Sequence, residues 1–371
     1  MKKVNGYEII QLFEQFAPKA YAMEGDKIGL QIGHLNKPVE NVLIALDVLE
    51  EVVDEAIQNR VQLIIAHHPI IFRPLQKITG DTYQGRLIEK LIKHDIAVYA
   101  AHTNLDIAKG GVNDMLAEAI GLQDPQILVP TFETKLKKLV VFVPEENGDQ
   151  LREVLGMAGA GAIGNYSFCT FSGSGIGRFL PGEDTNPHIG HAGKLEAVKE
   201  VRIETIYPEH SEKKILNAML KAHPYEEVAY DIYPLENKGE ILGLGKIGKI
   251  NEMTLKDFAE HIKAVLEVEK IRVVGDLDSK VTKVAVLGGD GNKYLSHAKF
   301  KGADVYITGD MYYHTAHDAM MMGVNIIDPG HNVEKVMKKG VANMLAKMCG
   351  QNGYEVSILP SRIHTDPFKF I

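Results

Sequence analysis

Short apolar runs alternate with amphipathic segments through both outer thirds of this chain of 371 residues. In the first third, residues 41–48, 61–68 and 96–103 have the character of strands, and residues 49–60 and 82–95 have the apolar spacing of helices. Strands separated by helices of this length pair in parallel through right-handed crossovers. The pattern therefore predicts an α/β fold with a largely parallel sheet flanked by helices.

The last third of the chain repeats this alternation. Residues 281–289, 303–310 and 324–328 are predicted strands, with helical segments between and after them. The same pattern on both sides of a different middle segment indicates one domain that the middle segment interrupts. We therefore predict a discontinuous α/β domain formed by residues 1–130 and 239–371.

Residues 131–238 follow a different order. Extended apolar runs and two helical segments are arranged as β-α-β followed by β-α-β, with a glycine-rich turn region at residues 173–193 between the halves. A segment of about a hundred residues in this order is typical of a ferredoxin-like sandwich. We predict that it forms an inserted ferredoxin-like α+β domain with a core of its own.

Charge and cysteine content exclude several classes of protein. The formal net charge of −8 argues against nucleic acid and anionic membrane surfaces as partners. The two cysteines, Cys169 and Cys349, exclude a disulfide framework and a cysteine-based zinc site. The N-terminal segment lacks the apolar core of a signal peptide and is predicted to be a helix capped by Asn5 and Glu8. No apolar run approaches membrane-spanning length, so we expect a cytoplasmic protein.

Residues that can ligate metal follow four of the predicted strands. They are His67 and His68, His102 and Asp106, Asp310 and His314, and Asp328, His331 and Glu334. Ligands of open α/β sheets bind outside the carboxyl ends of the strands, so these loops can share one crevice. Imidazole and carboxylate groups suit zinc, iron, manganese, cobalt and nickel, and a mixed set allows two ions bridged by a carboxylate.

Each of these pairs also has a plainer interpretation. Histidines beside a buried strand often pack or form a hydrogen bond, and His102 alone could be a buried imidazole bonded to a backbone carbonyl. Their repetition at four strand ends favours a shared metal site. GLGKIG at 243–248 matches the dinucleotide-binding fingerprint, but extended chain follows it and the next helix starts later with Thr254 as its cap, so we predict structural glycines there. GGDGNK at 288–293 lacks the Walker spacing, and we predict a tight turn after a strand, with an approach to phosphate as the alternative.

Five stretches of the chain resemble a known family. LIIAHHPIIF, YAAHTNLD, ITGDMYYHTAHDA, DPGHNVE and DPFKFI, in this order, are similar to the Nif-three-like family, also called GTP cyclohydrolase I type 2 homologues. The resemblance covers both outer thirds. It implies a ring-like homohexamer and two divalent ions per chain, zinc being the expected metal and iron or manganese the alternatives. The metal ligands that it implies are His67, His68, Asp106, His331 and Glu334.

The resemblance also suggests roles for other residues. His102, Asp310 and His314 lie on the same rim outside the ligand set, so we expect them to orient ligands or to exchange protons. The stretch HPYEEVAYDIYPL at 223–235 makes the insert similar to the CutA and PII domains. Two functions remain open. One is a metal-dependent, GTP cyclohydrolase-like hydrolase that acts on a nucleotide or a related phosphorylated substrate. The other is a metal-binding regulatory or adaptor protein without catalysis.

Overall fold

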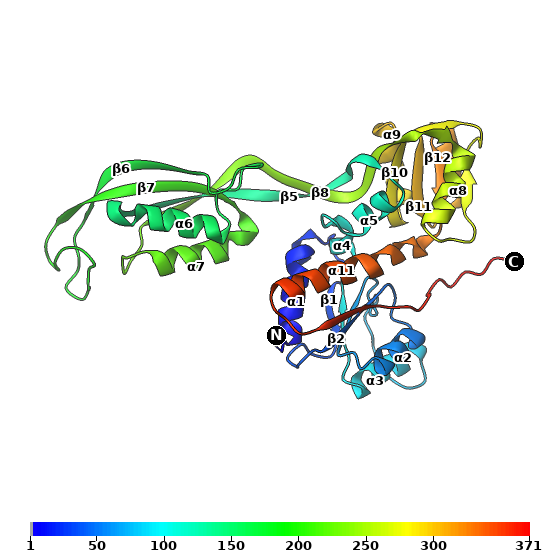
Figure 1. Ribbon diagram of the computed structural model, residues 1–371, viewed down its shortest axis with the longest axis horizontal. Helices are drawn as coiled ribbons and strands as arrows, with labels where there is room; N and C mark the ends of the chain where they lie inside the picture. Colours follow the sequence, from blue (N-terminus) through cyan, green and yellow to red (C-terminus); the bar gives the residue numbers. More distant parts are fainter. Residues whose placement is uncertain (1–2) are drawn as a thin grey trace. The chain divides into compact units, whose positions relative to one another are not determined.

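The computed structural model describes residues 3–371, and its chain divides into two compact units (Figure 1). Unit 1 comprises Met1–Phe132 and Leu242–Ile371, and unit 2 comprises Glu133–Ile241. The divisions fall inside two long strands, β5 (Gln123–Pro144) and β8 (Tyr230–Thr254), so each strand supplies residues to both units. Within residues 3–371, no helix has the length and apolar character needed to cross a bilayer.

The first sheet of unit 1 has the strand order β1-β4-β3-β2-β13. Its strands are β1 (Gly29–Ile32), β2 (Asn41–Ala45), β3 (Leu63–Ala66), β4 (Ala97–Ala100) and β13 (Ser357–Pro360). β13, β2, β3 and β4 run parallel, and β1 pairs antiparallel with β4. Every residue of β3 and β4 is buried, as their continuous apolar character requires.

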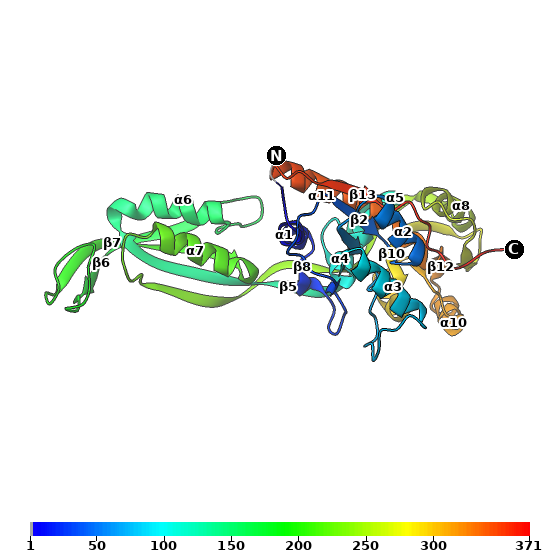
Figure 2. The ribbon, with the colours of Figure 1, turned by 90° about the horizontal axis from the view of Figure 1, so that it is seen from below.

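Helices cover both faces of this sheet. α2 (Glu50–Gln58) and α3 (Tyr83–Lys93) lie side by side on one face (Figures 1 and 2), where Val53 and Leu91 pack with Ile64. α1 (Gly6–Phe16) and α11 (Val336–Gln351) contribute to the core on the other face. The predicted capping box of α1 is confirmed, because the side chain of Asn5 accepts from the Glu8 backbone and the Glu8 carboxylate accepts from the Asn5 backbone.

The second sheet of unit 1 has the order β8-β10-β11-β12-β9. Its other strands are β9 (Arg272–Val274), β10 (Lys280–Asp290), β11 (Val305–Gly309) and β12 (Asn325–Asp328), and the helices of this half are α5 (Val112–Ala119), α8 (Leu255–Val265), α9 (Leu295–Phe300) and α10 (Tyr313–Met322). β10, β11 and β12 run parallel, whereas β8 and β9 pair antiparallel at the two sides.

The fold is therefore mixed α/β, with two sheets flanked by helices, as the alternation of strands and helices predicted. The expectation of one largely parallel sheet is corrected, because the parallel strands are divided between two sheets. The pattern of the sequence fixes crossovers between neighbouring strands but does not say which sheet a distant strand joins. The glycine stretch 243–248 lies in the extended strand β8, and Thr254 caps α8, both as expected.

Unit 2 contains strands β6 and β7, parts of β5 and β8, and two helices. β7 (Glu196–Pro208) pairs with β5 on one side and with β6 (Thr170–Phe179) on the other. α6 (Gly148–Ala158) and α7 (Glu212–Ala222) lie side by side against one face of this sheet (Figures 1 and 2). Their buried side chains form a separate core with those of β5 and β7.

Candidate metal centre

The first sheet supplies four residues of the candidate centre from its carboxyl edge. β3 and β4 are parallel neighbours, so the residues that follow them lie at the same edge of the sheet. β3 leads into His67 and His68, and β4 leads into His102. His102 precedes the short helix α4 (Thr103–Ile107), whose first turn carries Asp106.

The second sheet supplies the remaining residues. β11 is followed by Asp310, and β12 leads into the 3₁₀ helix η5 (His331–Lys335). Residues three apart lie on the same side of a 3₁₀ helix, and His331 Nε2 is indeed 3.2 Å from Glu334 Oε2. Residues far apart in the sequence thus meet where the two sheets end.

These side chains form three overlapping groups within the part of the chain that the structure describes. In each group the potential ligand atoms all lie within 4.8 Å of one another. The groups are His67, His68 and His102; His68, His331 and Glu334; and His67, Asp106 and Glu334. Because the groups share His67, His68 and Glu334, they form one continuous cluster that could hold a metal ion.

Glu334 is the carboxylate at the middle of this cluster. Its Oε2 atom lies 3.1 Å from His68 Nε2, 3.2 Å from His331 Nε2 and 3.7 Å from His67 Nε2. The residue is 3% exposed. Burial alone would raise the pKa of Glu334, but the charge of His67 and the hydrogen bonds of the histidines outweigh burial and lower this pKa well below its ordinary value. Glu334 is therefore negatively charged in the cluster.

Two buried atoms of the cluster have no hydrogen-bond partner among the described residues. His67 is fully buried, and its Nδ1 donates to the Ala101 carbonyl at 2.9 Å, whereas its Nε2 has no hydrogen-bond partner. This Nε2 lies 3.6 Å from Asp106 Oδ1, the second atom without a partner. Leaving a buried acceptor without a partner costs about 1–3 kcal/mol. A divalent cation between them would satisfy both atoms, so the residues present fit a metal.

Carboxylates on the far side of the rings orient the other three histidines. The Nδ1 atoms of His68 and His331 each lie 2.6 Å from a carboxylate oxygen, of Asp47 and Asp310 respectively. His102 Nδ1 lies 2.8 Å from an oxygen of Asp26. A carboxylate that accepts from Nδ1 fixes the tautomer in which Nε2 carries the lone pair, as metal-binding histidines require.

Without a cation, protons compensate the negative charge of the cluster. Burial by itself would lower the pKa of His68, but its hydrogen bonds to Asp47 and Glu334 raise this pKa to about 10. The hydrogen bond from His331 to Glu334, opposed by burial, raises the pKa of His331 to about 9. Burial raises the pKa of Asp106 to about 6. A metal ion would displace protons from these groups when it binds.

The cluster forms one wall of a cavity of about 740 Å³. The glycine turn after β10 forms another part of the wall. A Cβ atom at Gly289 would lie 2.8 Å from Glu334 Oε1, and Gly289 has a φ of +64° that side chains rarely adopt. The stretch 288–293, which we predicted to be structural, thus approaches the cluster closely.

The sequence of this chain matches the model of a known protein family. The family model of Duf34/NIF3 (NGG1p interacting factor 3) matches residues 4–367. The chain belongs to the DUF34/NIF3 family. It is 61% identical over 371 residues to the GTP cyclohydrolase 1 type 2 homolog of Bacillus subtilis, and the match covers 100% of both chains. The resemblance noted in the sequence is therefore confirmed.

Solved structures of the family agree with the fold. The chain is 63% identical to a Bacillus cereus protein related to NIF3, with a TM-score of 0.95 and 100% coverage of both chains. A Staphylococcus aureus protein is 33% identical with a TM-score of 0.78, again over 100% of both chains.

The structure brings together most of the residues that the sequence singled out. The cluster contains all five residues of the predicted ligand set, and it also contains His102. Asp310 lines the cavity and holds His331. His314 is exposed on α10 with its ring centroid 5.4 Å from that of Tyr313, and it does not line the cavity. Asp328 accepts from the Met311 backbone and from Arg272 and so stabilises the loop after β11.

Two carboxylates that hold histidines were missed in the sequence. Asp47 follows β2, so its position after a buried strand could have pointed to the same crevice. Asp26 lies in an irregular segment before β1 and gives no such signal. Its carboxylate also accepts from the Thr103 backbone at 3.0 Å, which ties this segment to the start of α4.

Proposed function

We propose that this chain is a hydrolase that depends on two divalent metal ions and acts on a nucleotide or a related phosphorylated substrate. The observation that carries the proposal is the pair of buried atoms without partners, His67 Nε2 and Asp106 Oδ1, beside the charged Glu334. The proposed ligands are His67, His68, Asp106, His331 and Glu334. Glu334 would serve both ions, because its carboxylate belongs to two of the three groups.

The donor set favours zinc as the metal, with iron and manganese as the alternatives to test. Imidazole nitrogen and carboxylate oxygen are ligands that all three accept. Two divalent ions in such a site lower the pKa of water and polarise phosphoryl or ring oxygens of a substrate. The cavity of about 740 Å³ beside the cluster leaves room for a nucleotide-sized molecule and favours catalysis over a closed, fully ligated structural site.

Among the histidines of the cluster, His102 is the one to which we assign proton transfer. His67, His68 and His331 each direct Nε2 to Glu334 Oε2 within 3.7 Å. The recorded carboxylate contact of His102 is through Nδ1, to Asp26, and its ring lines the cavity. An imidazole held in this way can accept a proton at Nε2 and return it. Asp310, which also lines the cavity, positions His331.

The names of the relatives guide the choice of substrate. Curated relatives are called GTP cyclohydrolase 1 type 2 homologs, so GTP should be the first nucleotide to test. The purified protein should be analysed for metal, loaded with zinc, iron or manganese, and screened for hydrolysis of a nucleotide library. We expect two ions per chain and turnover of at least one nucleotide.

Two matched variants test the assignment of roles. His102→Ala should retain most of the metal and lower turnover by about a hundredfold or more, the usual scale for a general acid or base. His314→Ala removes an exposed histidine outside the cavity and should leave both values unchanged. Loaded wild-type protein that hydrolyses no nucleotide above background would replace the enzyme proposal by the regulatory or adaptor function.

We also propose that residues 131–238 form an inserted ferredoxin-like domain of the CutA and PII kind, in a ring-like homohexamer. The antiparallel β5, β6 and β7, the paired α6 and α7, and their separate core support this assignment.

Joining Val129 to Gly239 through a short linker should give a folded chain that keeps its metal, because no proposed ligand lies in the segment removed. Light scattering of both chains tests the hexamer; insoluble or metal-free product would contradict the domain assignment.

A further inference from the structure

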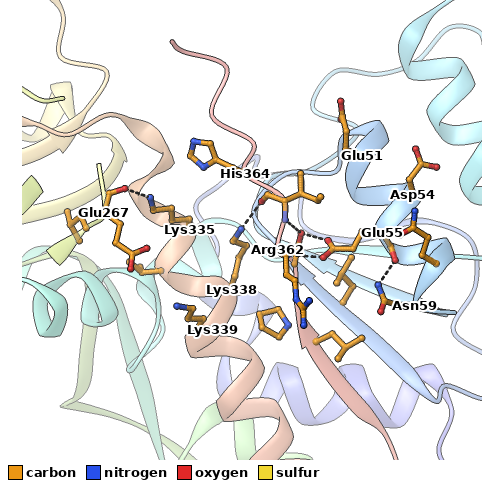
Figure 3. Close-up of a pocket in the computed structure, with 18 of the residues that line it drawn as sticks. Glu51, Asp54, Glu55, Asn59, Glu267, Lys335, Lys338, Lys339, Arg362 and His364 are labelled. Atoms are coloured by element: carbon orange, nitrogen blue, oxygen red, sulfur yellow. Dashed lines mark hydrogen bonds between the residues drawn. The ribbon is translucent and has the colours of Figure 1, made fainter. Parts of the chain in front are cut away.

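Unit 1 contains a second, larger cavity that shares no lining residue with the metal cavity. Its volume is about 1260 Å³. Figure 3 shows that α2 forms one side of it and the beginning of α11 the other, with the chain after β13 between them. The metal ligands and the candidate proton-transfer residue all lie outside this cavity, so the proposed hydrolase reaction does not explain it.

Four cationic side chains line this cavity and take part in no ion pair within residues 3–371. They are Lys335, Lys338 and Lys339 at the start of α11 and Arg362 in the chain after β13. Lys335 Nζ donates to the Glu267 carbonyl at 2.8 Å, and Lys338 Nζ donates to the Ile363 carbonyl at 2.9 Å. An ammonium group has three donors, so most of the donors remain available to a ligand. We name this set the lysine cluster.

Three of the four carboxylates that line this cavity lie apart from the lysine cluster, and the fourth, Glu267, lies beside Lys335 (Figure 3). Asp54 on α2 forms an ion pair with Lys90 at 2.6 Å. Glu55 accepts from Ser361 Oγ at 2.6 Å and from the Arg362 backbone at 2.8 Å. These two and Glu51 lie together on α2, across the cavity from the lysines (Figure 3). The cavity therefore has one cationic wall and one acidic wall.

The position of the lysines in their helix makes an anion more favourable still. The N-terminal end of a helix carries a partial positive charge, which cations destabilise and anions stabilise. α11 has no acidic residue in its first turn, whereas Lys338 and Lys339 lie there and Lys335 is the N-cap residue. Burial lowers the pKa of Lys338, and the charge of Glu55 opposes this only in part.

We propose that this cavity binds a phosphate ester, with the phosphate on the lysine cluster and hydroxyl or amine groups of the ligand facing the carboxylates of α2. A phosphate offers the acceptors that open ammonium and guanidinium donors need. The cavity is far larger than a phosphate ion, so an organic part is accommodated as well. The acidic wall disfavours long polyanions such as polyphosphate, because like charges repel across the cavity.

The test measures ligand binding by calorimetry with the full-length chain. Ribose 5-phosphate is the probe, with inorganic phosphate, ribose and tripolyphosphate for comparison. Each titration is run with zinc-loaded protein and with chelator-treated protein, because a phosphate can also bind a metal. We expect ribose 5-phosphate to bind both forms, inorganic phosphate to bind more weakly, and ribose not to bind.

A pair of charge-reversal variants assigns the binding to the cavity. Lys339→Glu reverses an exposed lysine of the cluster, and Lys347→Glu makes the same change in net charge on the same helix outside the cavity. Lys339→Glu should weaken binding of ribose 5-phosphate by about tenfold or more, the scale of one charge-assisted hydrogen bond. Lys347→Glu should leave it unchanged. Lys338→Gln, which keeps a polar side chain of similar length, should also weaken it.

Three results would overturn the proposal. The first is no binding of ribose 5-phosphate to either form at about 10 mM, which is weaker than a specific site allows. The second is binding that disappears with the metal and is unaffected by Lys339→Glu, because the phosphate would then bind at the metal centre. The third is tighter binding of tripolyphosphate than of ribose 5-phosphate, which would indicate a general polyanion surface. None of these results depends on whether the metal centre hydrolyses nucleotides.

Discussion

Unit 1 contains two cavities: the metal cavity, which is lined by the metal cluster, and the lysine cavity, which is lined by the lysine cluster. Their ionisable side chains have different hydrogen-bond partners. In the metal cavity, Asp47, Asp310 and Asp26 each hold a histidine at Nδ1, and Nε2 atoms are directed at Glu334. In the lysine cavity, the recorded hydrogen bonds of Lys335 and Lys338 go to backbone carbonyls. The metal cavity thus contains buried atoms without a hydrogen-bond partner, and the lysine cavity contains cations that take part in no ion pair among the described residues.

This comparison shows that a side chain without a hydrogen-bond or ion-pair partner indicates the charge of the ligand that could bind there. The buried atoms His67 Nε2 and Asp106 Oδ1 have no hydrogen-bond partner, and a cation that displaces protons from the cluster would satisfy both. Lysine ammonium groups without an ion pair at the N-terminal end of α11 favour the binding of an anion. The chain after β13 borders both cavities in turn, because residues 361–364 line the lysine cavity and residues 365–368 line the metal cavity.

The largest effect is expected when the central acceptor of the metal cavity is removed. Glu334→Gln keeps the shape of the side chain but removes a negative charge that faces three histidines. Metal affinity should fall by more than about a hundredfold, beyond the loss caused by removing an outer partner of a ligand. Elemental analysis after dialysis measures this. Asp366→Asn, which changes a carboxylate lining the same cavity outside the cluster, is the control and should keep its metal. Full metal content in Glu334→Gln would remove this residue from the ligand set.

Much of the candidate site could be predicted from the sequence because strands end where their apolar runs end. The run before His67 and the run before His102 placed these residues at a carboxyl edge, and the spacing of His331 and Glu334 placed both on one side of a helical turn. The division into two sheets could not be predicted in this way, because it depends on packing between helices such as α1, α8 and α11, which share one core.

Partners of the ligands were harder to predict than the ligands. Asp26 reaches His102 from an irregular segment 76 residues earlier in the chain. The lysine cluster was equally hidden, because a run such as Lys338 and Lys339 has the sequence of an ordinary solvated helix face. Only the folded chain shows that carboxylates nearby, such as Glu55, already have other partners.

A smaller effect is expected when the partner of a ligand is changed. Asp47→Asn should weaken metal binding by roughly 10–100-fold, because His68 loses the charged acceptor that orients its ring. Competition with a fluorescent zinc chelator measures the affinity. Asp54→Asn changes a carboxylate of the lysine cavity that pairs with Lys90, and it should leave metal affinity unchanged. Equal losses in both variants would mean that the effect is a general one of charge.

The stability of the metal-free chain should depend on pH through the same histidines. The pKa of His68 is raised from its ordinary value of 6.5 to about 10 in the folded chain. The folded state thus binds more protons, so the stabilisation is complete below about pH 6.5 and is lost as pH rises toward 10. The free energy of unfolding should fall by up to about 1.4 kcal/mol per pH unit in this range for each histidine with a raised pKa.

Urea unfolding of chelator-treated protein at several pH values between 6.5 and 9 measures this loss. His68→Ala should flatten the dependence, although His331, whose pKa is raised to about 9, would keep part of it. A divalent ion should oppose the trend, because deprotonated histidines bind metal better as pH rises. A pH dependence that is the same in His68→Ala would contradict the proposed protonation of His68.

The smallest effect concerns the lysine cavity without its anion. Lys339→Gln removes an unpaired cation from the first turn of α11, so it should raise the free energy of unfolding by about 0.3–1 kcal/mol in a buffer without phosphate or sulfate. Lys347→Gln, farther along the same helix, should give no such gain. Ribose 5-phosphate should then reverse the order, because it stabilises the wild-type chain more than the variant that binds it weakly. Destabilisation of Lys339→Gln in the anion-free buffer would mean that this lysine has a favourable partner of its own, and the contrast between the two cavities would then rest on Lys335 and Lys338.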